Sequence, residues 1–129
     1  MADLTGHCLC GQVRYRAAGP VIQANHCHCE SCRRATSSPV TSFFTVRADD
    51  AELAGASLAF YQSSPRHRRG FCSHCGSPMS YESENRPGEL DLYLVTLDDP
   101  SGVRVTAHDH WEERVSWLDI VDDLEKREG

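Results

Sequence analysis

Alternation of polar and apolar residues is the clearest pattern along this chain. Residues 12–17 alternate with a period of two, which is typical of a half-buried strand. Residues 40–46 are rich in the β-branched and aromatic residues that strands favour, and residues 58–61 form a short apolar run. The longest run covers residues 90–97, and residues 103–107 follow it after a turn. These segments predict five short strands.

Helical patterns are weak by comparison. Residues 30–35 predict one helical turn, and residues 119–126 predict a terminal turn or two. Gly and Pro interrupt the chain so often that small antiparallel sheets are favoured over alternating strands and helices. Because there is no internal repeat or long linker, we expect a single, mainly β domain over residues 1–129.

The composition is that of a globular protein. Of the 129 residues, 40% are hydrophobic and 25% are charged, which is enough apolar material for a packed core. No stretch approaches the roughly 20 apolar residues of a membrane span. The 13 Lys and Arg against 19 Asp and Glu give a net charge of −6, which argues against nucleic-acid binding. We therefore expect neither a membrane nor a nucleic acid as partner.

The unusual feature of the composition is the number of cysteines. There are seven, and an odd number cannot pair completely into disulfides within one chain. The first residues lack the basic start and apolar run of a secretory signal, so we expect a cytoplasmic protein with reduced thiols. In that compartment, closely spaced cysteines indicate metal ligands or catalytic groups.

All seven cysteines fall into three short groups. A tetrahedral zinc site takes about four ligands, and short local groups supply them readily. The central group can reach one ion by itself, and the outer two pairs together make a set of four. The groups are Cys8 and Cys10; Cys27, Cys29 and Cys32; and Cys72 and Cys75.

This division predicts two zinc sites of different kinds. A site with four thiolates is closed and structural, whereas one with three leaves a position for substrate and holds an exchangeable ion. The alternative is that a histidine completes the second site and both ions only stabilise the fold. Neither Cys-x-x-Cys pair has the strand-then-helix context of a thioredoxin-like redox motif. The histidines considered as the eighth ligand are His26, His28, His74, His108 and His110.

Four ordered motifs resemble the glutathione-dependent formaldehyde-activating enzyme family, which includes centromere protein V-like proteins. They read GHCLCGQVRY from Gly6, CHCESCRR from Cys27, FCSHCGS from Phe71 and HDHW from His108, and VSWL follows from Val115. The resemblance extends to about Leu124, so it covers nearly the whole chain. Residues 35–39 read ATSSP, where many relatives carry a glycine near Ser37.

The resemblance implies a small β-sheet fold like that of Rab-exchange-factor-like zinc proteins and peptide methionine sulfoxide reductase B. It also implies a carbon–sulfur lyase that joins glutathione and formaldehyde as S-hydroxymethylglutathione. The expected partners are therefore a glutathione-like thiol and an aldehyde. Carried onto this chain, the structural zinc ligands are Cys8, Cys10, Cys72 and Cys75, and the catalytic zinc ligands are Cys27, Cys29 and Cys32.

Basic residues flank the cysteines. Arg33 and Arg34 follow the last ligand of the central group, and a second cluster occupies residues 66–69. Either could bind the carboxylates of the thiol substrate through paired N–H donors. The alternatives are a solvated charged face, or N–H donors to metal-bound sulfur. His28 could carry a proton near neutral pH, although an extended ligand loop favours an outward orientation.

The remaining candidates are aromatic or histidine residues that could serve either the site or the core. On strands, aromatic residues belong to the core more often than to a pocket. His108 and His110 share one face if that stretch is extended, and hydrogen bonding is favoured there over a further metal site. The aromatic candidates are Phe43, Phe44, Trp111 and Trp117.

The leading hypothesis is a zinc-dependent carbon–sulfur lyase acting on a thiol adduct. Soft thiolate ligands with one open position suit a sulfur substrate. The alternative is a non-catalytic, zinc-stabilised module that binds another protein.

Overall fold

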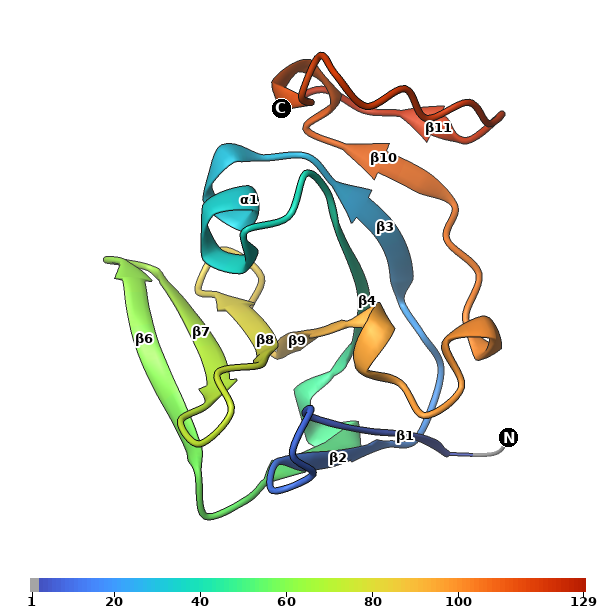
Figure 1. Ribbon diagram of the computed structural model, residues 1–129. Coiled ribbons are helices and arrows are strands. Elements are labelled where there is room, and N and C mark those ends of the chain that lie inside the picture. Colours follow the sequence, from blue (N-terminus) through green and yellow to red (C-terminus); the bar gives the residue numbers. More distant parts are fainter. Residues whose placement is uncertain (1–2) are drawn as a thin grey trace.

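Strands dominate the computed structural model, which describes residues 3–129 (Figure 1). A small antiparallel sheet has the order β1–β2–β5. Within the described residues, the α-helix is α1 (Glu30–Thr36). The strands of the small sheet are β1 (Leu4–His7), β2 (Arg14–Ala17) and β5 (Ala51–Ala54).

A larger sheet of eight strands has the order β11–β10–β3–β4–β9–β8–β7–β6. Its neighbours pair antiparallel except at β10, which runs parallel to both β3 and β11. Figure 1 shows α1 between the two ends of this sheet. The strands are β3 (Gln23–Cys27), β4 (Thr41–Arg47), β6 (Leu58–Ser64), β7 (His67–Cys72), β8 (Pro78–Ser83), β9 (Glu89–Tyr93), β10 (Ala107–Asp109) and β11 (Glu125–Lys126).

The predicted mainly β class is confirmed, with strands at or near four of the five predicted positions. They correspond to β2, β4, β6 and β9. The second half of the run 90–97 is instead a 3₁₀ turn, Leu94–Thr96, in which the Thr96 hydroxyl donates to the Tyr93 carbonyl. One sheet is larger than predicted and includes parallel pairs, because β10 and β11 extend it beyond β3.

Two other predictions near the end of the chain were wrong. Residues 103–107 alternate in burial but join no ladder before Ala107, where β10 begins. Residues 119–126 are not helical: they run without regular structure into β11. The segment pairs with β10, and Asp122 binds His108, so tertiary contacts replace the local hydrogen bonds of a helix.

The helix is longer than the single predicted turn because both of its ends are capped. The Cys29 side chain accepts a hydrogen bond from the backbone N–H of Cys32 at the first turn. Ser37 ends the helix in the left-handed region, with φ 54° and ψ 40°, and its backbone N–H donates to the Arg33 carbonyl. A residue with a β-carbon is strained in that region, whereas glycine is not.

The central strand β4 is buried on both of its faces. Phe43 and Phe44 are both almost inaccessible, and adjacent strand residues point to opposite faces. Phe44 belongs to the larger apolar cluster, which includes Cys8 and Cys72. Phe43 belongs to a second cluster, with Cys27, Cys32 and Tyr93. Each face of this part of the sheet therefore has its own apolar core, and each core contains cysteines.

A search of residues 3–129 for a helix of sufficient length and apolar character to cross a bilayer finds none.

The left-handed position at Ser37 predicts the effect of a substitution. Ser37→Gly should raise the free energy of unfolding by about 1 kcal/mol, because it removes the backbone strain. The matched control, Ser31→Gly within the helix, should lower it by about 0.5 kcal/mol. Urea denaturation of the metal-loaded protein measures both, and destabilisation by Ser37→Gly would contradict the assignment.

Candidate metal centre and substrate cavity

The first cysteine cluster joins two parts of the chain that are far apart in sequence. One ligand atom from each of its four cysteines lies within 4.8 Å of the others. The Cys10 sulfur is 3.6 Å from that of Cys8 and 3.7 Å from that of Cys72. Four sulfurs at about 2.3 Å from a tetrahedral ion would lie roughly 3.8 Å apart. The members are Cys8, Cys10, Cys72 and Cys75, and all are free thiols.

Nearby hydroxyl and amide groups favour the thiolate form of two cysteines in this cluster, Cys72 and Cys75, whereas the pKa of Cys10 is raised to about 12. The hydroxyl of Ser57 is 3.3 Å from the Cys72 sulfur, and that of Ser77 is 3.2 Å from the Cys75 sulfur. Hydrogen bonds from the side chain and backbone of Ser77 lower the pKa of Cys75 to about 5. The bond from Ser57 likewise lowers the pKa of Cys72. These donors suit sulfurs that carry negative charge, as metal ligands do.

The second cluster consists of Cys27, Cys29 and Cys32, whose sulfurs also lie within 4.8 Å of one another. Cys27 is the last residue of β3, Cys29 caps α1, and Cys32 lies in the first turn of that helix. The strand end and the helix start thus bring all three to one place. In residues 3–129, no histidine or carboxylate atom lies within 4.8 Å of all three sulfurs.

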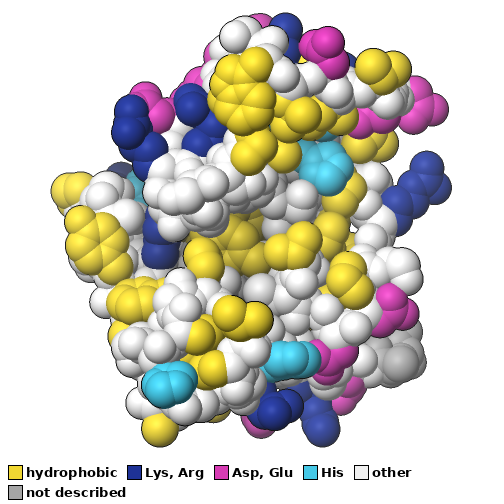
Figure 2. Space-filling view, in the orientation of Figure 1, with side chains coloured by type: hydrophobic (Ala, Val, Ile, Leu, Met, Phe, Trp, Pro, Cys, Tyr) yellow, Lys and Arg dark blue, Asp and Glu magenta, His cyan; other side chains and the backbone are white. Residues whose placement is uncertain are grey.

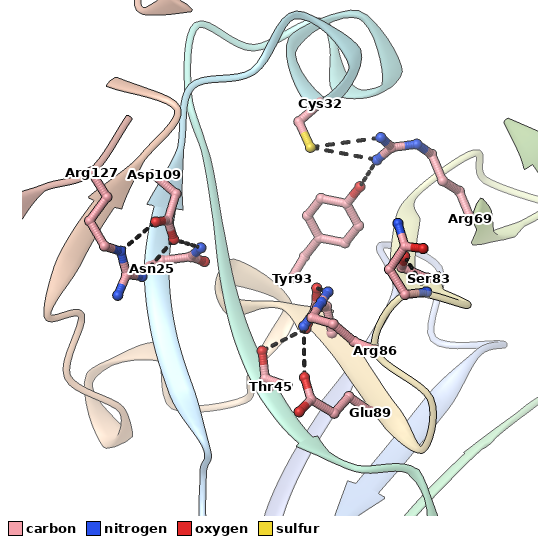
Figure 3. Close-up of polar contacts among 12 residues, drawn as sticks. Asn25, Cys32, Thr45, Arg69, Ser83, Arg86, Glu89, Tyr93, Asp109 and Arg127 are labelled. Carbon is pink, nitrogen blue, oxygen red and sulfur yellow. Dashed lines mark hydrogen bonds and ion pairs between the residues drawn. The ribbon is translucent and has the colours of Figure 1, made fainter. Parts of the chain in front are cut away.

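A buried arginine faces the last sulfur of the second cluster. The two terminal nitrogens of Arg69 lie 3.8 and 3.7 Å from the Cys32 sulfur, and one of them donates to the Tyr93 hydroxyl at 3.3 Å (Figure 3). The guanidinium also lies over the Tyr81 ring, 4.7 Å from its centroid. Arg69 is only 9% exposed, so water screens its charge weakly.

The pKa values of Cys27 and Cys32 shift in opposite directions. Hydrogen bonds from Cys27 and Cys29 lower the pKa of Cys32 to about 3, and the charge of Arg69 acts in the same direction. Hydrogen bonds of Cys27 with Cys29 and with Cys32 raise the pKa of Cys27 above its usual range. The hydrogen bonds to Cys32 and the charge of Arg69 both favour the thiolate form of Cys32, which is the form that binds a metal ion.

A broad, open cavity of about 1400 Å³ is lined by the second cysteine cluster and not by the first. All three cysteines of the second cluster line it, together with Arg69 and Tyr93. No cysteine of the first cluster does. Small molecules can therefore approach the second cluster from this cavity, whereas the first cluster, in which Cys10 is exposed, lies outside its lining.

The two predicted carboxylate-binding arginines occupy different positions. Arg34 lines the cavity and is exposed, with Glu30 as its ion-pair partner at 2.8 Å. Arg33 does not line it: its Nε donates to the carbonyl oxygen of His28 at 3.2 Å. In the other basic cluster, Arg69 donates to sulfur, whereas Arg68 pairs with Glu82 at the surface.

The expected outward orientation of His28 was wrong. Its side chain is buried, with 2% exposure, and its Nε2 lies 2.8 Å from Nδ1 of His108. The Trp111 ring packs edge-on against both imidazoles. Burial, followed by the charge of His108, lowers the pKa of His28 to about 4. His110 points elsewhere and pairs with Glu113, so His108 and His110 form no metal pair.

The aromatic candidates divide between cavity, core and surface. Phe43 lines the cavity and packs on Tyr93, with ring centroids 4.5 Å apart. Phe44 is fully buried in the core. Trp117 is 73% exposed and belongs to neither.

Sequence reasoning missed Tyr93 and Asp122. Tyr93 lay inside a run that predicts only a strand, and Asp122 lay in an acidic stretch interpreted as a helical turn. No local pattern distinguishes either residue, because their partners Arg69 and His108 are distant in sequence.

Known proteins are similar to this chain in sequence and in structure. The chain is similar to an uncharacterized lyase of Schizosaccharomyces pombe, with 29% identity over 96 residues that cover 73% of this chain and 69% of the relative. It is also similar to a crystal structure of a Rhodobacter sphaeroides protein, with 25% identity, a TM-score of 0.62, and coverage of 78% of this chain and 90% of that one.

A sequence model described as glutathione-dependent formaldehyde-activating enzyme matches residues 3–114, which contain both cysteine clusters and most of the cavity lining. The chain therefore belongs to the glutathione-dependent formaldehyde-activating enzyme family.

Proposed function

We propose that this protein is a zinc-dependent carbon–sulfur lyase that acts on a thiol adduct such as S-hydroxymethylglutathione. In the addition direction, the thiol sulfur forms a bond to the aldehyde carbon, and the thiol proton ends on the aldehyde oxygen. The reverse reaction breaks that bond and returns the proton to sulfur. The observation that carries the proposal is that the three-cysteine cluster, unlike the four-cysteine cluster, opens into the cavity.

Both clusters suit zinc by their chemistry. Free thiols grouped at these distances form soft, tetrahedral donor sets, which zinc prefers. When bound in the second cluster, zinc would supply one further position that holds a substrate sulfur as its thiolate. Cys27, Cys29 and Cys32 would be the ligands there, and Cys8, Cys10, Cys72 and Cys75 would hold the structural ion.

Charge balance gives Arg69 a role in substrate binding. Three thiolates and one divalent ion carry a net charge of −1, so an anionic thiol would be repelled. The buried guanidinium beside Cys32 offsets that charge and remains fixed by Tyr93 and Tyr81. Since the pair is poorly screened, this compensation is stronger than it would be at the surface.

Arg34 is the better placed of the two adjacent arginines to bind a substrate carboxylate. Its pair with Glu30 is exposed, and such surface pairs contribute little stability, so the guanidinium can exchange partners. Arg33 is already bonded to the His28 carbonyl and lies off the cavity lining.

The alternative, a non-catalytic protein-binding module, has one observation in its favour. Apolar side chains gather on the surface over the C-terminal part of the chain, at the top of Figure 2. Among the exposed residues there are Trp117, which is 73% exposed, and Val121, which is 94% exposed. The cavity at the three-cysteine cluster is not needed for such a module, and this favours the enzyme.

The direct test is turnover. Zinc-loaded protein should accelerate the interconversion of glutathione, formaldehyde and S-hydroxymethylglutathione at least about tenfold over buffer, measured by exchange proton NMR. Glutathione alone should change the environment of one zinc and leave the other unchanged. If the interconversion is not accelerated and glutathione changes the environment of neither zinc ion, the protein is the non-catalytic module instead.

Substitution of one cysteine from each cluster tests the division of roles. Cys32→Ala should reduce the zinc content from two ions to one and leave a folded protein, because the first cluster remains complete. Cys75→Ala should unfold the domain or lower its melting temperature strongly, because that ion joins distant segments. Metal analysis and thermal denaturation provide the comparison, and equal damage from both substitutions would contradict the division.

Arg69→Met tests the proposed charge compensation. The methionine can pack on Tyr81, but the positive charge is lost, so KM for the anionic thiol should rise about tenfold. Arg68→Met is the matched control, because it removes the same charge from the neighbouring, exposed position. Steady-state kinetics at constant zinc occupancy measure both variants. An unchanged KM in Arg69→Met would show that Arg69 has no such role.

A further inference from the structure

A chain of polar side chains connects the second cysteine cluster with a segment outside the family match. The match ends at residue 114, whereas residues 122–129, which we call the 122–129 segment, lie beyond it. Asp122 Oδ2 is 2.8 Å from Nε2 of His108, and Nδ1 of His108 is 2.8 Å from Nε2 of His28. His28 lies between the ligand-loop residues Cys27 and Cys29.

The two histidines inside this hydrogen-bonded chain of side chains are buried. His108 has no exposed surface and His28 has only 2%. Trp111 packs edge-on against both rings, with centroids 4.8 Å from His108 and 5.1 Å from His28. Buried polar groups need partners, and each imidazole obtains one from the next member of the chain.

The Asp122 carboxylate determines the direction of the hydrogen bonds. A carboxylate only accepts, so His108 donates from Nε2. In the neutral form of His108, Nδ1 then carries a lone pair and accepts from His28, which must be protonated on Nε2. One acidic side chain thereby selects the tautomer of two histidines and the orientation of the ring inside the ligand loop.

The 122–129 segment is itself held against the site. Its strand β11 pairs with β10, and Arg127 makes two hydrogen bonds to the Asp109 carboxylate, at 2.6 and 2.8 Å (Figure 3). Asp109 also accepts from Asn25 of β3, two residues before Cys27. Arg127 lines the cavity. The segment therefore lines the cavity directly and is connected to the ligand loop through His108 and Asp109.

We infer that Asp122 is a positioning residue that, through His108 and His28, holds the loop of Cys27 and Cys29 in the geometry needed for its ion. The inference rests on the proposed zinc in the second cluster. Loss of Asp122 would leave His108 without its acceptor and allow both rings, and with them the loop, to reorient. Changes to residues that orient metal-binding groups cost about 10- to 100-fold in metal affinity or activity.

The test compares Asp122→Ala with Asp123→Ala. Asp123 is exposed, has no hydrogen bond or ion pair in residues 3–129, and carries the same charge one residue away. Zinc release to a chelator is followed in time, and the phase that disappears in Cys32→Ala belongs to the second cluster. Asp122→Ala should accelerate this phase about tenfold and leave the other phase unchanged, whereas Asp123→Ala should match the unsubstituted protein.

A second measurement determines the tautomers of the two histidines and does not depend on metal release. Long-range proton–nitrogen NMR should find both His28 and His108 protonated on Nε2, with this single tautomer lost in Asp122→Ala. If that variant does not fold, Asp122→Leu, which is close in size and also lacks a hydrogen-bond acceptor, is measured in the same way.

The inference would be overturned if Asp122→Ala left the rate of zinc release from the second cluster unchanged, or if it accelerated release from both clusters equally. A His28 protonated on Nδ1 in the unsubstituted protein would also overturn it. Because neither readout requires turnover, failure of the lyase activity would remain distinguishable from failure of this role.

Discussion

Burial of β4 on both faces is the constraint on which the rest of the structure depends. A strand with one solvated face would allow only one core, and the side chains of Phe43 and Phe44 could not both be covered. With both faces covered, the sheet separates two apolar clusters. Each contains two cysteines of one metal-binding group, so the two clusters occupy different surroundings.

This separation gives similar ligands different surroundings, as the roles proposed for them require. The first cluster joins Cys8 to Cys72 and closes a long loop, and an ion there would stabilise the fold by linking segments that are far apart in sequence. The second cluster is built locally, from a strand end and a helix start, and strand pairing and helix capping hold its backbone. Such a local scaffold suits the proposed exchange of ligands at this site.

Charge distinguishes the second cluster further. Arg69 brings a buried positive charge to Cys32, and Tyr93 holds that guanidinium in place. On the other side, His28 and His108 are hydrogen-bonded to each other and support the loop without adding a competing ligand. At the cavity, Arg69 therefore offsets the negative charge of the sulfur cluster, and the two histidines support the geometry of its loop.

The sequence by itself determined the ligand chemistry and the class of fold. Seven cysteines in three short groups can be divided as four and three by spacing, because ligand geometry is local, and alternation with a period of two identified strands such as β2 and β4. The tertiary structure alone decided what surrounds the ligands. Arg69 reaches Cys32 across 37 positions, and Asp122 reaches His108 from a stretch that looked helical. Such contacts depend on strand order and register, in particular on the parallel pairing of β10 with β3 and β11, which no local pattern of residues encodes.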